Sequence, residues 1–359
     1  MEMKEYIKLF LRHCPELAKS MAQSDHNYSS EFLNFWHCEG SVLTHTFLVA
    51  QQTEKFKLND IVKISALLHD IGKPICEERN HERKRVNFIG HEGCSSFLSL
   101  TAIQKMNLRI SHDELSQLVQ LLSLHTILFR LMEKEDYIEV IKNKFKGNKT
   151  LLSNLIWLSK CDALGRFTDH ENHIAENIEI LLKPVLDNIS DEKPECSKEL
   201  SATVLCGPPL AGKTQWIKEN VNLDTTIVIS RDDIVLQMGD GKSYSESWNS
   251  IDQSLVEKEY QRQKKEAALS KKSIVFDLTN CSAKARRSCL SSLSPKEYNK
   301  KAVVLYTGYE ELLQRNLARA ASEGKYISPG VITAFVKSFT APLYDEVDEI
   351  TNIFNFNKK

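Results

Sequence analysis

The chain has 359 residues, of which 42% are hydrophobic and 26% charged, and its net charge is -1 at pH 7. This length exceeds one hydrophobic core, the composition excludes a largely disordered chain, and the charge predicts no strong attraction of the whole molecule to nucleic acid. No apolar run reaches the roughly 18 to 20 residues of a membrane span, and the first residues do not resemble a secretory signal. The nine cysteines are scattered along the chain, which predicts reduced thiols in a cytoplasmic protein.

The first half, residues 1–189, is predicted to be helical. Asn59 can cap a helix with one apolar stripe, and Ser111 and Glu114 form a capping box ahead of another. Two further stretches, 151–164 and 171–186, continue the helical pattern. Because no convincing alternating strand is found in this half, we expect an all-α domain.

Six side chains in this half have the spacing of metal ligands. Their successive separations of 24, 22, 34 and 37 residues are each about one helix plus a connection, with one adjacent pair. They are His45, His69, Asp70, His91, His125 and Asp162. A single helical histidine is usually an ordinary polar residue, but the joint order, and above all the run H-D-I-G-K-P, favours one shared centre.

The chemistry expected of such a centre is phosphate ester hydrolysis. Asp70 could bridge two metal ions, and two ions about 4 Å apart would hold a hydroxide and clamp the ester. Lys73, one turn beyond Asp70, would face the same centre and stabilise phosphate charge.

Other histidines are weighed against this set. His112 precedes Asp113 in a first helical turn and has no Gly-Lys behind it, so we exclude it. His81, in the charged loop NHERKR, could instead contact substrate. His170 and His173 follow Asp162 loosely and could take its place as ligands.

A proline and clustered charges at 188–199 predict a linker to a second domain, residues 200–359. Short β-rich runs separated by helical stretches follow. The runs are 202–206, 225–230, 273–277 and 301–306. This alternation predicts an α/β domain whose parallel sheet is covered on both faces.

Residues Gly207 to Thr214 fit the pattern G-x-x-x-x-G-K-[ST], directly after the first run and before a helical stretch. Gly207 and Gly212 let backbone amides surround phosphate oxygens at a helix N-terminus. Lys213 would neutralise the β- and γ-phosphates, and the Thr214 hydroxyl would bind Mg²⁺.

Further polar residues follow the other runs. Asp232 and Asp233 could supply a base for an attacking hydroxyl or only cap the next helix, and Asp277 and Asn280 could be outer partners of Mg²⁺. Arg315 and Arg319 share one helical face, as phosphate clamps of a lid or as ordinary surface arginines. Basic stretches could line a phosphate groove or form solvated helix faces. They contain Lys258, Arg262, Lys264, Lys265, Lys271, Lys272, Lys284, Arg286, Arg287, Lys296, Lys300 and Lys301.

The second-half motifs GPPLAGKT, SRDD and RNLAR followed by SPGVI resemble the 5′-OH polynucleotide kinase branch of P-loop phosphotransferases. The resemblance implies that Lys213 and Thr214 hold ATP or another NTP with Mg²⁺, that Asp232 is the general base, and that Arg319 is a lid arginine on the phosphates. Val235 occupies the position at which the phage-type kinase has an arginine for the acceptor's 3′-phosphate, which puts a preference for such acceptors in doubt.

The first-half pattern, over about residues 40–170, resembles the HD-domain metal phosphohydrolases. By this resemblance one divalent transition metal ion, such as Mn²⁺, Ni²⁺, Co²⁺ or Zn²⁺, is surrounded by His45, His69, Asp70 and Asp162, and a second by Asp70, His91 and His125. Arg166, one turn after Asp162, would then be available to the scissile phosphate.

Both halves together resemble the bifunctional HD-domain polynucleotide kinase–phosphatases of bacteria. The resemblance implies removal of 2′,3′-cyclic, 2′- or 3′-phosphates and phosphorylation of 5′-OH ends of RNA or DNA, with a nucleic acid ligase acting downstream and no membrane partner. Two alternatives stay open: an HD nucleotide phosphohydrolase fused to a small-molecule kinase, and one fused to an NTP-operated binding switch.

Overall fold

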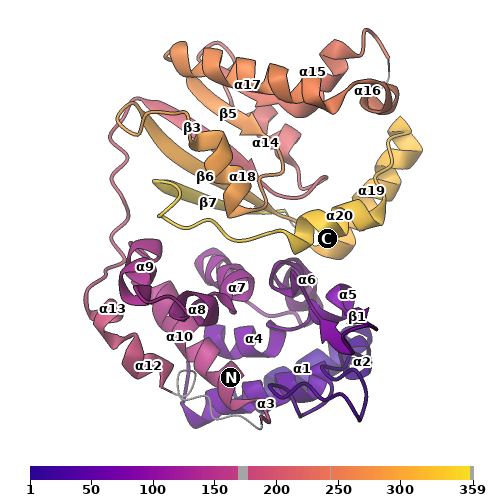
Figure 1. The fold of residues 1–359 in the computed structure, drawn as a ribbon, viewed down its shortest axis with the longest axis vertical. Coiled ribbons are helices and arrows are strands. Elements are labelled where there is room, and N and C mark those ends of the chain that lie inside the picture. The colour runs from indigo at the N-terminus through magenta and orange to yellow at the C-terminus, as the bar shows by residue number, and fades with distance from the viewer. Residues whose placement is uncertain (169–176, 243, 356–359) are drawn as a thin grey trace. The chain divides into compact units, whose positions relative to one another are not determined.

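The computed structural model describes residues 1–168, 177–242 and 244–355, and the chain divides into two compact units (Figure 1). The helical unit contains residues 1–192 together with the short segments 308–310 and 336–341. The sheet unit contains residues 193–307, 311–335 and 342–359. Among the described residues, no helix combines the length and apolarity needed to cross a membrane.

The helical unit is built from short and medium helices. They are α1 (Met3–His13), α2 (Pro15–Gln23), α3 (Val42–Lys55), α4 (Asp60–Leu68), α5 (Lys73–Cys76), α6 (His91–Lys105), α7 (His112–Leu124), α8 (Ile127–Met132), α9 (Tyr137–Lys144), α10 (Lys149–Leu164), α12 (Ile178–Leu181) and α13 (Lys183–Asp187). The predicted caps are confirmed, because the Asn59 side chain accepts from the Val62 N–H and Ser111 and Glu114 cap each other's backbone.

Helix α4 lies at the centre of this unit and contacts α3, α7 and α10. It is apolar on nearly every side, and all its residues from Ile61 to Leu68 except Lys63 are buried. A helix that is apolar all round belongs in a core. The chain therefore carries the polar pair His69-Asp70, which follows α4 directly, into the interior of the unit.

One expectation for the first half was wrong. The half contains a small antiparallel hairpin, β1 (Glu78–Asn80) and β2 (Arg85–Asn87), with Arg79 paired to Val86. Its three-residue strands are mostly polar, so no alternating pattern marks them. In the stretch 171–186, the described part from residue 177 is helical as expected and forms the two short helices α12 and α13.

The sheet unit has five parallel strands in the order β4-β5-β3-β6-β7. The strands are β3 (Leu200–Cys206), β4 (Thr226–Ser230), β5 (Ser273–Asp277), β6 (Tyr298–Tyr306) and β7 (Glu349–Phe354). The helices are α14 (Lys213–Asn220), α15 (Arg231–Met238), α16 (Tyr244–Ser250), α17 (Gln253–Leu269), α18 (Ala283–Leu290), α19 (Tyr309–Glu323) and α20 (Pro329–Lys337).

The predicted parallel α/β organisation of the second half is confirmed, and each of the four β-rich runs forms a strand, although β4 begins at Thr226, one residue after the start of its predicted run. The sequence analysis missed β7, which pairs with β6 from Glu349 opposite Lys301 to Phe354 opposite Tyr306. Polar residues interrupt its apolar positions, so only its partner strand identifies it.

Candidate functional site

The six predicted ligand residues come together inside the helical unit, although they lie on five separate elements. His45 is on α3, His69 and Asp70 follow α4, His91 begins α6, His125 follows α7, and Asp162 is on α10. All are buried except His91, which is half-buried. Helix packing thus places residues that are far apart in the sequence around one centre.

Gly72 explains how α6 reaches this centre. A Cβ atom at Gly72 would lie 2.4 Å from the carbonyl oxygen of His91 and 2.7 Å from the amide nitrogen of Ser95. Only glycine allows the start of α6 to pack so closely on the turn after Asp70. The glycine of H-D-I-G-K-P therefore has a packing role beside the two charged residues.

One group of donor atoms surrounds the Oδ2 side of Asp70. His45 Nε2 lies 3.0 Å from Asp162 Oδ1 and 3.7 Å from Asp70 Oδ2, and His69 Nε2 lies 3.2 Å from Asp70 Oδ2. Ligands that share one ion at about 2.1 Å are about 3.0 to 3.5 Å from each other. These separations fit such an arrangement to within a few tenths of an ångström.

A second group surrounds the other oxygen of Asp70. Its Oδ1 atom lies 3.4 Å from His91 Nε2 and 3.8 Å from His125 Nε2, and the two Nε2 atoms are 3.0 Å apart. Because each carboxylate oxygen faces a different group, Asp70 has the orientation of a bridging ligand.

Backbone hydrogen bonds orient three of the rings. The Nδ1 atoms of His69, His91 and His125 donate to the carbonyl oxygens three residues earlier, over 2.9, 2.8 and 2.7 Å. A carbonyl can only accept, so each Nδ1 carries a proton, and in the neutral ring the lone pair is then on Nε2, which faces the centre. This is the tautomer that a metal ligand requires.

The electrostatics favour metal-binding protonation states at Asp70, His91 and His125. Burial works to raise the pKa of the Asp70 carboxyl, but the neighbouring His69 and Lys73 outweigh it and hold that pKa well below its ordinary value. Burial also lowers the pKa of His91, and that of His125 to about 4. At His45 burial works in the same direction, but the hydrogen bonds to Asp162 and Glu39 outweigh it and raise the pKa of that ring. Ionised carboxylates and neutral imidazoles are the states in which these groups bind cations, so a cation bound at His45 would displace a proton.

The donor set fits a pair of divalent transition metal ions. His69 Nε2 and Asp70 Oδ1 are buried and have no hydrogen-bond partner among the described residues. Leaving such atoms unsatisfied costs about 1–3 kcal/mol each, which a cation would offset. Imidazole nitrogens mixed with carboxylate oxygens suit Mn²⁺, Co²⁺, Ni²⁺ or Zn²⁺.

Two cationic side chains border the centre. Lys73 Nζ lies 2.7 Å from Asp70 Oδ2, and an Arg166 nitrogen lies 2.6 Å from Asp162 Oδ2. Both residues line a cavity of about 640 Å³ that also exposes Asp70, His91, His125 and Asp162. An anion entering this cavity would meet two positive charges beside the candidate ligands.

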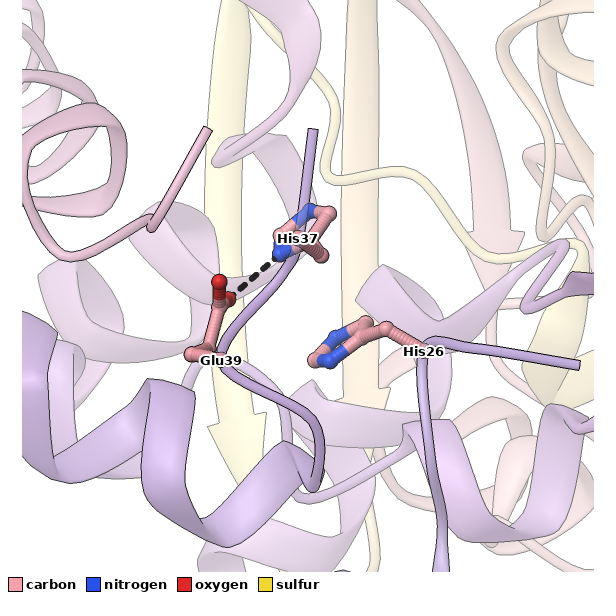
Figure 2. A group of neighbouring side chains, drawn as sticks. All are labelled: His26, His37 and Glu39. Atoms are coloured by element: carbon pink, nitrogen blue, oxygen red, sulfur yellow. Dashed lines mark hydrogen bonds and ion pairs between the residues drawn. The ribbon is translucent and has the colours of Figure 1, made fainter. Parts of the chain in front are cut away.

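The sequence analysis missed three polar residues beside the centre, His26, His37 and Glu39 (Figure 2). Glu39 Oε1 lies 2.8 Å from Nδ1 of His37 and 2.8 Å from Nδ1 of His45, and His26 Nε2 lies 2.9 Å from Lys73 Nζ. A concentration of histidines between residues 26 and 45 was the available signal.

These three residues form a supporting network and are poorly arranged to hold an ion of their own. Their ligand atoms lie within 4.8 Å of one another, but both ring nitrogens of His26 already have partners, Nδ1 the Gly40 carbonyl oxygen at 3.0 Å and Nε2 the Lys73 Nζ at 2.9 Å. Glu39 instead holds His45 in the way that outer carboxylates orient metal-binding histidines.

The remaining histidines lie outside the centre. His112 and Asp113 are exposed in the first turn of α7, as expected for a helix start. His81 is exposed in the hairpin turn, where its Nδ1 atom contacts the Tyr28 hydroxyl at 2.7 Å. His170 and His173 lie outside the described residues.

In the sheet unit, the predicted P-loop connects β3 to α14. Gly212 has φ +101°, a left-handed conformation that favours glycine. Lys213 Nζ donates to the carbonyl oxygens of Gly207 and Pro208 at 3.0 Å, and burial lowers its pKa. Thr214 follows in the first turn of α14, so the loop has the geometry of an anion cradle at a helix N-terminus.

Asp232 lies in the first turn of α15, at the carboxyl end of β4. Its Oδ1 atom accepts a 2.9 Å hydrogen bond from the Tyr244 hydroxyl. The side chain that caps α15 is that of Ser230, which accepts from the Asp233 N–H. The cap therefore requires neither carboxylate, while Val235 is fully buried in the same helix.

Four other predicted site residues of this half are Asp277, Asn280, Arg315 and Arg319. Asp277 ends β5, and burial raises the pKa of its carboxyl. The Asn280 side chain is bound to the backbone instead, because its Nδ2 donates to the Leu205 carbonyl. Arg315 Nη1 donates to the Leu210 carbonyl in the P-loop, and the Nε of Arg319 is buried without a hydrogen-bond partner among the described residues.

Several residues of the basic stretches are bonded within the sheet unit. Arg286 is fully buried and makes two hydrogen bonds to Glu346, and buried Lys264 donates to the Ser288 carbonyl. Arg262 pairs with two glutamates of its own helix. These three side chains are therefore engaged within the protein and do not face a nucleic acid.

One comparison with known proteins covers much of the second half. The family model described as AAA domain matches residues 203–342. No curated protein matches the chain. These residues form a P-loop domain, and the ligand that such a domain implies is a nucleoside triphosphate with Mg²⁺.

Three solved structures share weak similarity. One is a protein from Chloroflexus aurantiacus described as a kinase, with 13% identity, a TM-score of 0.34 and coverage of 44% of this chain and 87% of that chain. Another is the Pnkp1/Rnl/Hen1 RNA repair complex, with 19% identity, a TM-score of 0.33 and coverage of 40% and 45%. The third is a gluconokinase from Sinorhizobium meliloti, with 13% identity, a TM-score of 0.30 and coverage of 44% and 84%.

Proposed function

We propose that this chain is a bifunctional enzyme that repairs nucleic acid ends. The helical unit removes 2′,3′-cyclic, 2′- or 3′-phosphates from RNA or DNA, and the P-loop unit phosphorylates 5′-OH ends with an NTP. A ligase acting downstream would join the products.

The observation that carries this proposal is the arrangement around Asp70. Its two oxygens face separate pairs of imidazole nitrogens, and the centre opens into a cavity that contains Lys73 and Arg166. This arrangement supports the resemblance to HD-domain phosphohydrolases residue by residue.

In the helical unit, His45, His69, Asp70 and Asp162 would hold one divalent ion and Asp70, His91 and His125 the other. Such ions supply a nucleophile at neutral pH and neutralise phosphate charge. Lys73 and Arg166 orient the phosphate through charge-assisted hydrogen bonds. Asp162 holds the Arg166 guanidinium at 2.6 Å, which fixes its direction.

In the P-loop unit, the Asp232 carboxylate takes the proton of the terminal 5′-hydroxyl. The 5′-oxygen then forms a bond to the γ-phosphorus while the bond from that phosphorus to the β,γ-bridging oxygen breaks, which releases the nucleoside diphosphate. Lys213 and Arg319 neutralise charge on the transferred group, Arg315 supports the loop, and Thr214 contributes an oxygen to Mg²⁺.

The test uses two variants of the full chain and oligonucleotides of both sugars. Asp70→Asn should abolish release of phosphate from 3′-phosphorylated ends and leave 5′-kinase activity intact, and Lys213→Ala should do the reverse. Loss of both activities in either variant, with unchanged folding by circular dichroism, would show that the two sites are wrongly assigned.

The metabolic alternative makes a different prediction for the substrate. A small-molecule enzyme would hydrolyse a free nucleoside 3′-phosphate at least as well as a 3′-phosphorylated oligonucleotide. The binding-switch alternative predicts no transfer of γ-phosphate to any 5′-OH oligonucleotide.

A further inference from the structure

An exposed aromatic segment lies beside the cavity of the helical unit. In the run F-L-N-F-W, the side chains of Phe35 and Trp36 are 59% and 47% exposed, and those of Phe32 and Leu33 are 37% and 48% exposed. Such a concentration of exposed apolar surface marks a binding site in a soluble protein. It stands outside the metal centre and has no part in the chemistry proposed above.

The β1–β2 hairpin places basic residues directly against this segment. Lys84 Nζ lies 3.9 Å from the centroid of the Phe32 ring, in the turn that also exposes Arg83, and exposed Arg85 follows at the start of β2. The Tyr28 ring lies against that of Phe32, and its hydroxyl contacts His81 in the same turn. An aromatic face and a cation therefore meet where the segment touches the hairpin.

Both parts of this surface continue into the cavity wall. Asn34 and His37 of the aromatic segment line the cavity, and so do residues 86–89, which end the hairpin. The same cavity contains Lys73 and Arg166. A chain with its terminal phosphate at these two cations could leave the cavity past Asn34 and residues 86–89, which border the aromatic segment and the hairpin.

We infer that this aromatic–basic rim, defined as Phe32, Phe35, Trp36, Arg83 and Lys84, binds the last nucleotides of a single-stranded nucleic acid. Base stacking on exposed aromatic side chains together with phosphate neutralisation is the chemistry of single-strand recognition. The inference rests on the proposed phosphatase function and identifies what selects a polymer end over a small phosphate ester.

The experiment compares two substrates on the same metal-loaded protein. One is p-nitrophenyl phosphate, which has no nucleobase, and the other is a single-stranded hexanucleotide with a 3′-phosphate. In Phe35→Ala and Trp36→Ala, the ratio of kcat/KM for the hexanucleotide to that for the small ester should fall about tenfold, within the range expected for one lost stacking contact. Lys84→Ala should lower this ratio and weaken its dependence on salt.

Matched controls are Leu11→Ala and Lys134→Ala, an exposed apolar and an exposed basic residue that do not line the cavity. Both should leave the ratio within twofold of the parent value. Fluorescence anisotropy of a labelled hexanucleotide on the Asp70→Asn chain measures binding without turnover, and Trp36→Ala in that background should weaken it by a similar factor.

The outcomes separate the two proposals. If the parent chain hydrolyses neither substrate, the phosphatase function is wrong. The anisotropy measurement then decides by itself whether the rim binds nucleic acid. If it hydrolyses both and the rim variants keep both the ratio and the affinity, the rim does not bind nucleic acid and the inference is overturned, while the phosphatase function stands.

Discussion

The Nε2 atoms of His91 and His125 lie 3.0 Å apart, although the Nδ1 of each ring already donates its proton to a backbone carbonyl. Two neutral imidazoles in this tautomer present lone pairs to each other, an arrangement that is repulsive unless a cation lies beside both. The pair is therefore the sharpest geometric sign of a cation site in the helical unit.

Metal content tests this relationship directly. We expect the parent chain to retain about two divalent ions per chain after dialysis, and His125→Ala to retain about one fewer, measured by inductively coupled plasma mass spectrometry. His112→Ala, which changes an exposed histidine in the first turn of α7, is the matched control. Equal metal content in all three proteins would remove the basis for the site.

The kinase base is tested by neighbouring carboxylates. Asp232→Asn should lower kcat for 5′-phosphorylation by about 10²- to 10⁴-fold, because the variant can no longer take up the hydroxyl proton. Asp233→Asn is isosteric and adjacent and should keep activity near the parent value, since Ser230 caps α15. Similar losses in both variants would argue that this turn has only a structural role.

The pH dependence of stability follows from two buried histidines. Burial lowers the pKa of His37 to about 3 and that of His125 to about 4. The unfolded chain therefore binds protons at both residues below about pH 6.5 while the folded chain does not, so stability falls with falling pH from about 6.5 towards 4.

Urea unfolding in the presence of a chelator, at pH 7.5 and pH 5.0, measures this loss. The metal-free parent chain should lose more unfolding free energy on acidification than His37→Gln, in which one of the two groups is gone. The difference should be on the order of 1–2 kcal/mol. An identical loss in both would show that His37 becomes protonated in the folded state as readily as in the unfolded one.

Stability of the sheet unit depends on a buried ion pair. Arg286 and Glu346 are both buried and share two hydrogen bonds, of 2.9 and 3.1 Å. Arg286→Met should cost about 3–5 kcal/mol because it leaves the Glu346 carboxylate buried without its partner. Exposed Arg287, which pairs with Asp345, should lose under about 1 kcal/mol on replacement by alanine.

The double variant Arg286→Met/Glu346→Leu should recover most of that loss, because apolar residues of similar size can replace a buried pair. Chemical denaturation of the parent chain, Arg286→Met, Glu346→Leu and the double variant gives the coupling between the two residues. If the double variant is as unstable as the sum of its single changes, the pair is not the origin of the loss.

The sequence by itself determined the features encoded in neighbouring residues. The P-loop is one contiguous motif, the caps at Asn59 and Ser111 act within one helical turn, and the β-rich runs of the second half predict their own strands. The six candidate ligands were also found from sequence, because H-D-I-G-K-P anchors the pattern and the other histidines follow at helix-length intervals.

Tertiary structure alone decided what depends on pairing between distant segments. The strands of the hairpin are polar, and the apolar pattern of β7 is interrupted. They form because a paired strand accepts and donates their backbone hydrogen bonds, and local sequence propensity does not reveal that partner. Packing brought Glu39 to His45, buried Arg286 against Glu346, and set Lys84 over Phe32. The sequence does not show whether a charged or aromatic side chain faces water or a neighbouring residue. Only the folded chain therefore shows that Glu39 supports His45, that Arg286 is buried in an ion pair, and that Lys84 contacts Phe32.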